Sequence, residues 1–138
     1  MRQRERVFID SGAWIALALT RDPFHTRALE LWALLMHSAA RLYTSVPVVI
    51  ETFTFLERNV NRDVALQWKD SFSVLSTLKV LECGLEDLNR SWAFFQRRDL
   101  HKLSAVDATS FALMKPHKIS LAFTFDHHFA SVGFRVLG

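Results

Sequence analysis

Short hydrophobic runs alternate along the chain with longer segments in which hydrophobic residues recur at helical spacing. We expect strands at the short runs, which are residues 7–9, 41–44, 78–81, 119–125 and 134–137. We expect helices at residues 12–19, 23–38, 47–58, 61–75, 85–96 and 104–114, and at most one helical turn at 127–131. Strands separated by helices pair in parallel, with helices on both faces. The pattern therefore predicts a three-layer α/β/α fold around a central, mainly parallel sheet of four to five short strands.

The composition indicates one compact domain over residues 1–138. Half of the residues are hydrophobic, and four Gly and three Pro are too few for a flexible linker or a low-complexity tail. A chain of this length buries roughly two-thirds of its extended surface on folding, which suffices for a core without disulfide or metal crosslinks. The sequence contains no internal repeat, so a repeat array is excluded.

Cysteine content and the length of hydrophobic runs indicate the compartment. Cys83 is the single cysteine, so an internal disulfide is impossible and a secreted disulfide scaffold is excluded. The longest runs without a charged residue, 11–20 and 31–40, have ten residues each, whereas a membrane helix needs roughly 20. The apolar run before Asp10 is too short for the core of a secretory signal. We therefore expect a cytoplasmic protein without a membrane segment.

Two acidic residues directly follow predicted strands. Asp10 ends the run 7–9, and Asp126 ends the run 119–125. Ligands of a parallel α/β sheet bind beyond the carboxyl ends of its strands, so we expect both acids at the edge that carries the functional site. Each acid also suits an alternative role as the N-cap of the helix that follows it.

Two further acids lie near the beginnings of predicted helices. Glu51 lies among hydrophobic residues, and Pro47 and Phe55 occupy the positions four residues away where a basic partner would stabilise it. Asp107 follows Ser104 by three residues, a spacing that also resembles a helix capping box. Convergence of the four acids at one edge of the sheet is a more economical explanation than four separate structural roles.

Four carboxylates at one site require a cation. Each pair of charges at about 4 Å repels by about 4 kcal/mol at an effective dielectric near 20. Ligation by oxygen alone, without Cys or His at metal-binding spacing, selects Mg²⁺ or Mn²⁺ rather than Zn²⁺. Such an ion lowers the pKa of a bound water and neutralises charge on a phosphate. We therefore predict that Asp10, Glu51, Asp107 and Asp126 bind Mg²⁺ or Mn²⁺ and catalyse phosphodiester hydrolysis.

The net charge favours a polyanionic substrate. Seventeen Lys and Arg accompany 14 Asp and Glu, a net charge of +3, and the isoelectric point is near 9.4. Without the four acids of the predicted site, 17 basic residues accompany 10 acidic ones, a net charge of +7 that suits RNA. Four residues are candidate RNA contacts or, alternatively, ordinary solvated surface: Arg97, Arg98, Lys102 and His127. We expect His128 on the same exposed turn, and the four Trp and most of the 12 Phe in the core.

Four segments of the sequence resemble those of PIN-domain ribonucleases. They are Phe-Ile-Asp-Ser at 8–11, Val-Ile-Glu at 49–51, Leu-Ser-Ala-Val-Asp-Ala at 103–108 and Thr-Phe-Asp-His-His-Phe at 124–129. In order and spacing they are similar in particular to those of the VapC toxins of bacterial and archaeal toxin–antitoxin pairs. The resemblance extends over nearly the whole chain, although residues 59–98 carry no family signature. It implies a PIN-like α/β/α fold.

The resemblance also implies roles for individual residues. The four acids named above match the acidic quartet that binds Mg²⁺ or Mn²⁺ in the family, with Asp10 and Asp107 as the most direct ligands. Ser11 and Thr124 match hydroxyl positions that support the site through hydrogen bonds to a carboxylate or to water. Gly12 stands where family members often carry a small hydroxyl residue. The family is usually dimeric, and a small antitoxin that blocks the acidic site holds its toxins inactive.

The sequence thus predicts a Mg²⁺- or Mn²⁺-dependent endoribonuclease that is the toxin of a VapBC-type pair, forms a homodimer and binds an antitoxin. Two alternatives stay open, an RNA-processing PIN nuclease without antitoxin and a non-catalytic PIN-like module whose acids bind a basic peptide. Two phosphoryl-transfer folds fit less well. A haloacid-dehalogenase-like phosphatase requires a second acid where Gly12 stands, and a response-regulator receiver requires a Lys at a late strand end, where none follows Phe125.

Overall fold

A single parallel sheet forms the centre of the molecule. The computed structural model describes residues 4–138, and within that range five strands lie in the order β3-β2-β1-β4-β5 with every neighbouring pair parallel. Their bounds are β1 Arg6–Ile9, β2 Arg41–Ser45, β3 Leu78–Leu81, β4 Leu121–Phe123 and β5 Arg135–Leu137. The chain adds β2 and β3 on one side of β1, then β4 and β5 on the other. The strand order therefore reverses at β1, which is where such sheets bind ligands.

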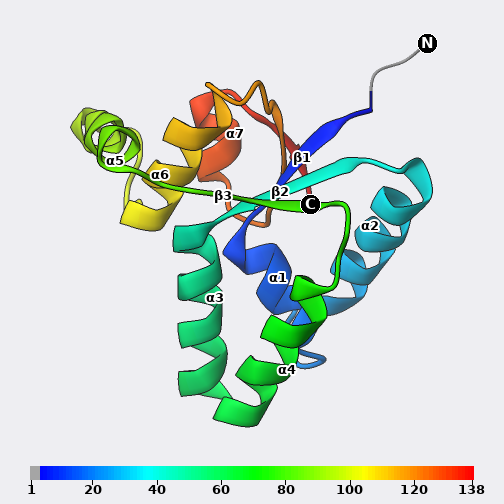
Figure 1. The fold of residues 1–138 in the computed structure, drawn as a ribbon. Coiled ribbons are helices and arrows are strands. Elements are labelled where there is room, and N and C mark those ends of the chain that lie inside the picture. Colours follow the sequence, from blue (N-terminus) through cyan, green and yellow to red (C-terminus); the bar gives the residue numbers. More distant parts are fainter. Residues whose placement is uncertain (1–3) are drawn as a thin grey trace.

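Helices cover both faces of this sheet (Figure 1). In the described range they are α1 Ser11–Ala18, α2 His25–Ser38, α3 Val46–Asn59, α4 Arg62–Ser73, α5 Leu85–Ser91, α6 Ala105–Met114 and α7 His128–Val132, with a 3₁₀ helix, η1, at Trp92–Gln96. Helices α1 to α4 lie on one side of the sheet and α5 to α7 on the other. The predicted three-layer α/β/α fold is confirmed.

Local sequence signals explain where several helices begin. The Ser45 side chain accepts a hydrogen bond from the backbone of Val48 at the start of α3, and Asn61 caps α4 in the same way. Helix α2 begins at His25 rather than at Pro23 as predicted. The carboxylate of Asp22 accepts the N–H of Phe24 at 2.8 Å, which forms a turn that delays the helix.

Two predicted elements differ from those observed. Strand β4 spans three residues instead of the predicted 119–125, because the N–H of Ile119 bonds to the carbonyl of Met114 and closes the turn after α6. The predicted helix 85–96 divides into α5 and η1, and its hydrophobic stripe is on the surface. Leu85, Trp92 and Phe95 are 73%, 47% and 47% exposed. The predicted core assignment of Trp92 is therefore wrong.

The core is continuous through both faces of the sheet. Val7, Phe8 and Ile9 of β1 are fully buried, as expected of a strand with neighbours on both sides and helices above and below. On the α1 to α4 side, Trp14 packs with its ring centroid 5.9 Å from that of Trp32 and 6.0 Å from that of Trp68. On the opposite side, α6 is buried from Asp107 to Met114.

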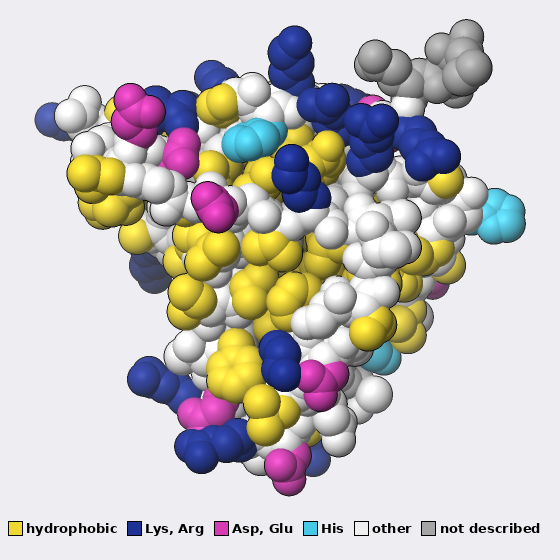
Figure 2. Space-filling view, viewed as in Figure 1, with side chains coloured by type: hydrophobic (Ala, Val, Ile, Leu, Met, Phe, Trp, Pro, Cys, Tyr) yellow, Lys and Arg dark blue, Asp and Glu magenta, His cyan; other side chains and the backbone are white. Residues whose placement is uncertain are grey.

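Hydrophobic and basic side chains gather on different parts of the surface seen from the direction of Figure 1. Figure 2 shows hydrophobic side chains across the middle of this face, and Lys and Arg gathered along its upper edge and at its lower end. Among the described residues, no helix has both the length and the hydrophobicity needed to cross a membrane.

Candidate metal centre

Two adjacent parallel strands deliver two of the predicted acids to the same edge of the sheet. Asp10 directly follows β1, and its N–H donates to the carbonyl of Phe123 in β4 at 3.0 Å, so the two chains are still paired at this point. Thr124 and Asp126 follow β4. The carboxyl ends of parallel strands meet at one edge, and Asp10 and Asp126 therefore lie beside the reversal of strand order.

Asp10 occupies the N-cap position of α1 but does not act as a cap. Its carboxylate makes no capping hydrogen bond. Instead Oδ2 accepts a hydrogen bond from the Thr124 hydroxyl at 2.9 Å, and Oδ1 is buried without a hydrogen-bond partner among the described residues. The residue is only 3% exposed. A buried carboxylate oxygen without a donor is costly, and a cation would satisfy it.

Glu51 reaches the site from the second turn of α3. The hydroxyl of Ser11 donates to its Oε1 at 2.5 Å, so the first residue of α1 orients this carboxylate. Glu51 is half-buried, whereas the sequence placed it among buried hydrophobic residues. The expected surroundings of Glu51 are therefore wrong, because Val46, Ile50 and Phe55 of α3 are exposed and only the opposite face of this helix enters the core.

Asp107 lies in the first turn of α6 and is 6% exposed. The Ser104 side chain caps this helix by accepting the N–H of Asp107 at 3.0 Å. The predicted resemblance to a capping box is therefore half correct, since Ser104 caps while the Asp107 carboxylate turns toward the other acids. Burial raises the pKa of Asp107 to about 9, helped by the charge of Asp10 and by a hydrogen bond with Asp126.

The pKa values of Asp10 and Asp126 show how tightly the acids are grouped. Burial raises the pKa of Asp10 to about 6, the Thr124 hydrogen bond opposes the rise, and the charges of Glu51 and Asp126 add to it. Burial also disfavours ionisation of Asp126, but hydrogen bonds from Asp107 and His128 outweigh it and lower the pKa of Asp126. The site therefore holds one readily ionised acid, Asp126, beside two carboxyls, Asp10 and Asp107, whose ionisation burial disfavours unless a positive charge is present.

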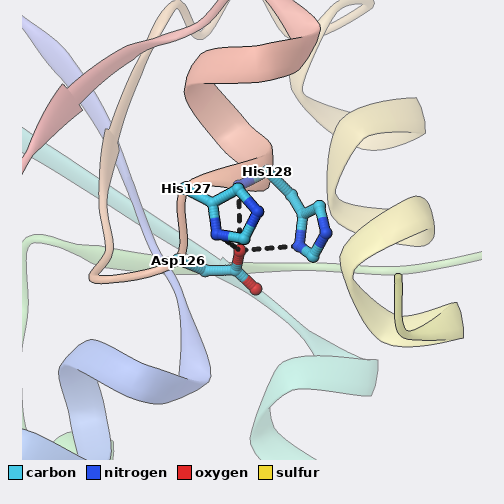
Figure 3. Close-up of side chains that lie close together, drawn as sticks. All are labelled: Asp126, His127 and His128. Atoms are coloured by element: carbon cyan, nitrogen blue, oxygen red, sulfur yellow. Dashed lines mark hydrogen bonds and ion pairs between the residues drawn. The ribbon is translucent and has the colours of Figure 1, made fainter. Parts of the chain in front are cut away.

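Asp126 also touches two histidines, as Figure 3 shows. Its Oδ1 accepts the backbone N–H of His128 at 2.8 Å, which forms a turn before α7, whose N-cap residue is His127, and the Nδ1 atom of His128 lies 2.7 Å from the same oxygen. The Nδ1 atom of His127 is 3.9 Å away. His128 is buried, which contradicts its expected place on an exposed turn, and the sequence carries no local signal for this burial beyond the adjacency of the two histidines.

The donor atoms favour a hard cation bound by the acids. Asp126, His127 and His128 bring ligand atoms within 4.8 Å of one another, but the carbonyl of His101 occupies the Nε2 atom of His128 and Asp126 itself occupies Nδ1. The acids offer oxygen ligands, an unpartnered Oδ1 on Asp10 and, at Asp10 and Asp107, pKa values raised chiefly by burial and further by the neighbouring carboxylates. These residues fit Mg²⁺ or Mn²⁺.

The candidate RNA contacts lie on the surface, and their surroundings differ. Arg97 pairs with Asp99 at 2.6 Å and donates to the carbonyl of Ser131, so it is held in place as part of a local network. Arg98 and Lys102 are exposed, and the His127 side chain is 82% exposed. Arg98, Lys102 and His127 are therefore the members of this set whose polar groups are most accessible to a ligand.

Comparison with known proteins establishes the family. A model of the PIN domain matches residues 7–135, which is most of the chain. The protein therefore belongs to the PIN-domain family, and the fold and the four acids described above lie within the matched region.

The chain is similar in sequence and structure to a protein of Mycobacterium tuberculosis, and in fold to one of Rickettsia felis. The chain is 35% identical over 129 residues to the 23S rRNA-specific endonuclease VapC20 of M. tuberculosis, covering 93% of this chain and 95% of the relative. The crystal structure of VapC20, described as a sarcin-ricin loop cleaving toxin, superposes with a TM-score of 0.81 at 31% identity and the same coverage. VapBC2 of R. felis, solved bound to promoter DNA, has a TM-score of 0.68 at 12% identity over 95% of this chain and 96% of that one, which supports the fold alone.

Proposed function

We propose that this protein is an endoribonuclease of the VapC type that hydrolyses RNA phosphodiester bonds with Mg²⁺ or Mn²⁺. The observation that carries the proposal is the buried acidic site, in which Asp10 Oδ1 has no hydrogen-bond partner in the described structure and Asp107 resists ionisation. A cation bound among such carboxylates offsets the cost of burying their charges. Similarity over most of the chain to an rRNA-specific endonuclease supports RNA as the substrate.

The acids and the hydroxyl residues of the site have different proposed roles. Asp10 and Asp107 are the proposed direct ligands, and the ion, when bound, lowers the pKa of a water and neutralises charge on the phosphate. Ser11 holds Glu51, and Thr124 both donates to Asp10 and accepts the N–H of Asp126 at 3.0 Å. One hydroxyl therefore fixes the spacing between two acids from adjacent strands, which keeps the ligand set preorganised.

We infer that the substrate is a structured RNA and that basic residues outside the site attract it. The relative with 35% identity acts on 23S rRNA, and a ribosomal loop is accordingly the first RNA to test. The chain has a net charge of +3 even with the acidic site included. Phosphate attraction of this kind is independent of sequence and weakens as salt concentration rises, whereas the choice of loop depends on shape.

Two apolar grooves support the proposed protein partners. A groove of about 760 Å³ runs between α3 and α5, is lined by residues such as Ile50 and Leu85, and includes Glu51, which suits a second copy of the chain beside the site. A groove of about 490 Å³ between α1, α2 and α4 is lined by Trp14, Trp32 and Trp68 and suits a hydrophobic antitoxin segment.

We infer that the protein acts in the cytoplasm as the toxin of such a pair. The free thiol of Cys83 is consistent with a reducing compartment.

Neutralising the acids tests the proposed activity. Asp10→Asn and Asp107→Asn keep the shape of each side chain but remove its charge, so we expect cleavage of an rRNA fragment to fall by at least about a hundredfold, the range lost with a direct electrostatic contribution to the reaction. Cleavage is measured with purified protein in Mn²⁺, with and without EDTA. The control is Asp70→Asn, which removes an exposed charge from α4.

The same experiment separates the alternatives. Retained cleavage in both Asn variants would contradict the proposed site. Binding of Mn²⁺ by the wild type without cleavage of any RNA tested would favour a non-catalytic module. Cleavage without growth arrest on expression, and without a copurifying small protein, would favour an RNA-processing enzyme over a toxin.

A further inference from the structure

The buried imidazole of His128 touches the acidic site and the loop that precedes α6. We propose that His128 is a positioning residue of the metal site, which clamps the Asp126 carboxylate and links it to the segment that presents Asp107. The relevant contacts all lie on one side of the Asp126 carboxylate. Figure 3 shows the dashed lines converging on one carboxylate oxygen, while the other oxygen projects away from both histidines.

Both nitrogens of the His128 ring lie close to an oxygen atom. Its Nε2 atom lies 2.7 Å from the carbonyl oxygen of His101, and a carbonyl can only accept, so Nε2 donates. Its Nδ1 atom lies 2.7 Å from Asp126 Oδ1 but off hydrogen-bond geometry, and it makes no hydrogen bond elsewhere among the described residues. Two lone pairs would repel at that distance, so the proposed clamp places a hydrogen between Nδ1 and Oδ1. In the clamp the ring then bridges two acceptors.

These contacts hold the Asp126 carboxylate through one of its two oxygens. Its Oδ1 is held from two directions, by the Nδ1 atom of His128 and by the N–H of the same residue at 2.8 Å. A carboxylate fixed through one oxygen cannot rotate freely, and its second oxygen keeps a constant direction toward the site. Groups that orient a ligand in this way control the affinity of a metal site without touching the ion.

His128 also contacts the segment that leads into α6. His101 lies three residues before Ser104, whose side chain caps α6 at Asp107. The imidazole thus ties the end of β4 to the entry of α6, which are far apart in sequence but supply two neighbouring acids. His128 does not fit the role of metal ligand or proton-transfer group, because Nε2 bonds to the His101 carbonyl, Nδ1 lies against Asp126 and the side chain is only 7% exposed.

Two amide substitutions separate the two contacts. In His128→Asn the amide nitrogen takes the place of Nδ1 and keeps a donor toward Asp126, whereas in His128→Gln it takes the place of Nε2 and keeps only the donor toward His101. We expect calorimetric Mn²⁺ affinity to fall by about 10- to 100-fold in His128→Gln and by much less in His128→Asn, although both lose one hydrogen bond of the clamp. His37→Gln, an exposed substitution on α2, is the control for loss of an imidazole.

A purely structural His128 predicts a different pattern. In that case the two variants would lose Mn²⁺ affinity in proportion to their loss of thermal stability, or neither would lose affinity, and either result would overturn the proposal. A spectroscopic test needs no variant. In the wild type with ¹⁵N-labelled histidine, we expect a slowly exchanging, downfield proton between Nδ1 and Asp126, and a freely exchanging Nδ1 would equally refute the clamp.

The inference rests on the proposed function for the identity of the metal site. If the wild type binds no Mn²⁺, the proposed function fails, and the labelled-histidine spectrum still decides whether the clamp exists. If the wild type binds Mn²⁺ and His128→Gln binds it equally well, the positioning role fails and the proposed function stands.

Discussion

Asp107 and Asp10 are buried acids whose protonation depends on what else occupies the site. The pKa of Asp107 is raised to about 9 and that of Asp10 to about 6, in both cases chiefly by burial, from an ordinary value of 3.8. At neutral pH and without metal, the Asp107 carboxyl is therefore protonated. A cation must displace that proton to bind, so metal affinity increases as pH rises.

The same pKa shifts predict how stability depends on pH. Between about pH 4 and about pH 9, Asp10 and Asp107 bind more protons in the folded protein than in the unfolded chain, because their folded pKa values are higher, so their contribution to the free energy of unfolding falls as pH rises through this window. We expect wild-type protein in EDTA to lose more stability between about pH 5.5 and about pH 8.5 than Asp107→Asn does, since the amide cannot titrate. Urea unfolding measures both proteins.

The same urea unfolding measurement is repeated at both pH values with Mn²⁺ in place of EDTA. The ion binds the ionised acids, so it should stabilise the wild type more at the higher pH than at the lower one. Identical pH dependence of wild type and Asp107→Asn in EDTA would show that Asp107 does not carry the shifted titration.

Among the elements, α6 depends most clearly on its first turn. It is buried from Asp107 to Met114, so the N–H groups of its first turn have little access to water, and Ser104 satisfies one of them. The cap also fixes where the chain enters α6, and therefore where Asp107 lies. An error in this turn would therefore affect both the stability of the fold and the geometry of the acids.

Removing the cap hydroxyl tests this dependence. Ser104→Ala leaves the N–H of Asp107 without its acceptor, and we expect a loss of about 1 kcal/mol in the free energy of unfolding. Ser104→Thr retains the hydroxyl and should recover most of that loss. Ser73→Ala removes an exposed hydroxyl near the end of α4 and serves as the control. Equal stability of Ser104→Ala and wild type would contradict a capping role.

At the scale of the whole molecule, exposed hydrophobic residues on α3 and α5 call for a partner. Ile50 and Leu85 lie on the two sides of the groove that also includes Glu51, and exposed apolar surface of this extent is characteristic of an interface. A second copy seated there would cover both residues and stand beside the acidic site. Assembly would then shape the opening through which RNA enters.

A charge in the groove tests the proposed homodimer. Ile50 is 61% exposed, so Ile50→Lys should leave the fold intact but place an unpaired charge in the interface, and we expect the variant to sediment as a monomer where the wild type sediments as a dimer. Leu34→Lys is a matched control, because Leu34 is also 61% exposed but lies on α2, outside the groove. A monomeric wild type at micromolar concentration would refute the dimer.

The fold was predictable from sequence wherever the signal was local. The runs at residues 7–9 and 78–81 predict strands because hydrophobic residues are contiguous there, and the helices follow from periodicity and from caps such as Ser45 and Asn61. The position of Asp10 after a buried strand also predicts its place at the carboxyl edge. These properties depend on a few neighbouring residues and on the geometry of parallel strands.

Other features depend on contacts between distant segments, and only the tertiary structure decided them. The stripe of Leu85 and Trp92 has the spacing of a core face, yet no element within residues 4–138 covers it, because the strand order places α6 rather than α5 against the sheet interior. Likewise His128 is buried through contacts with Asp126 and the distant His101 carbonyl. The sequence alone determined the α/β class and the places of Asp10 and Asp126 at the carboxyl edge of the sheet. Which surfaces stay open and which groups hold those acids depends on burial and partners across the fold, which no local pattern encodes.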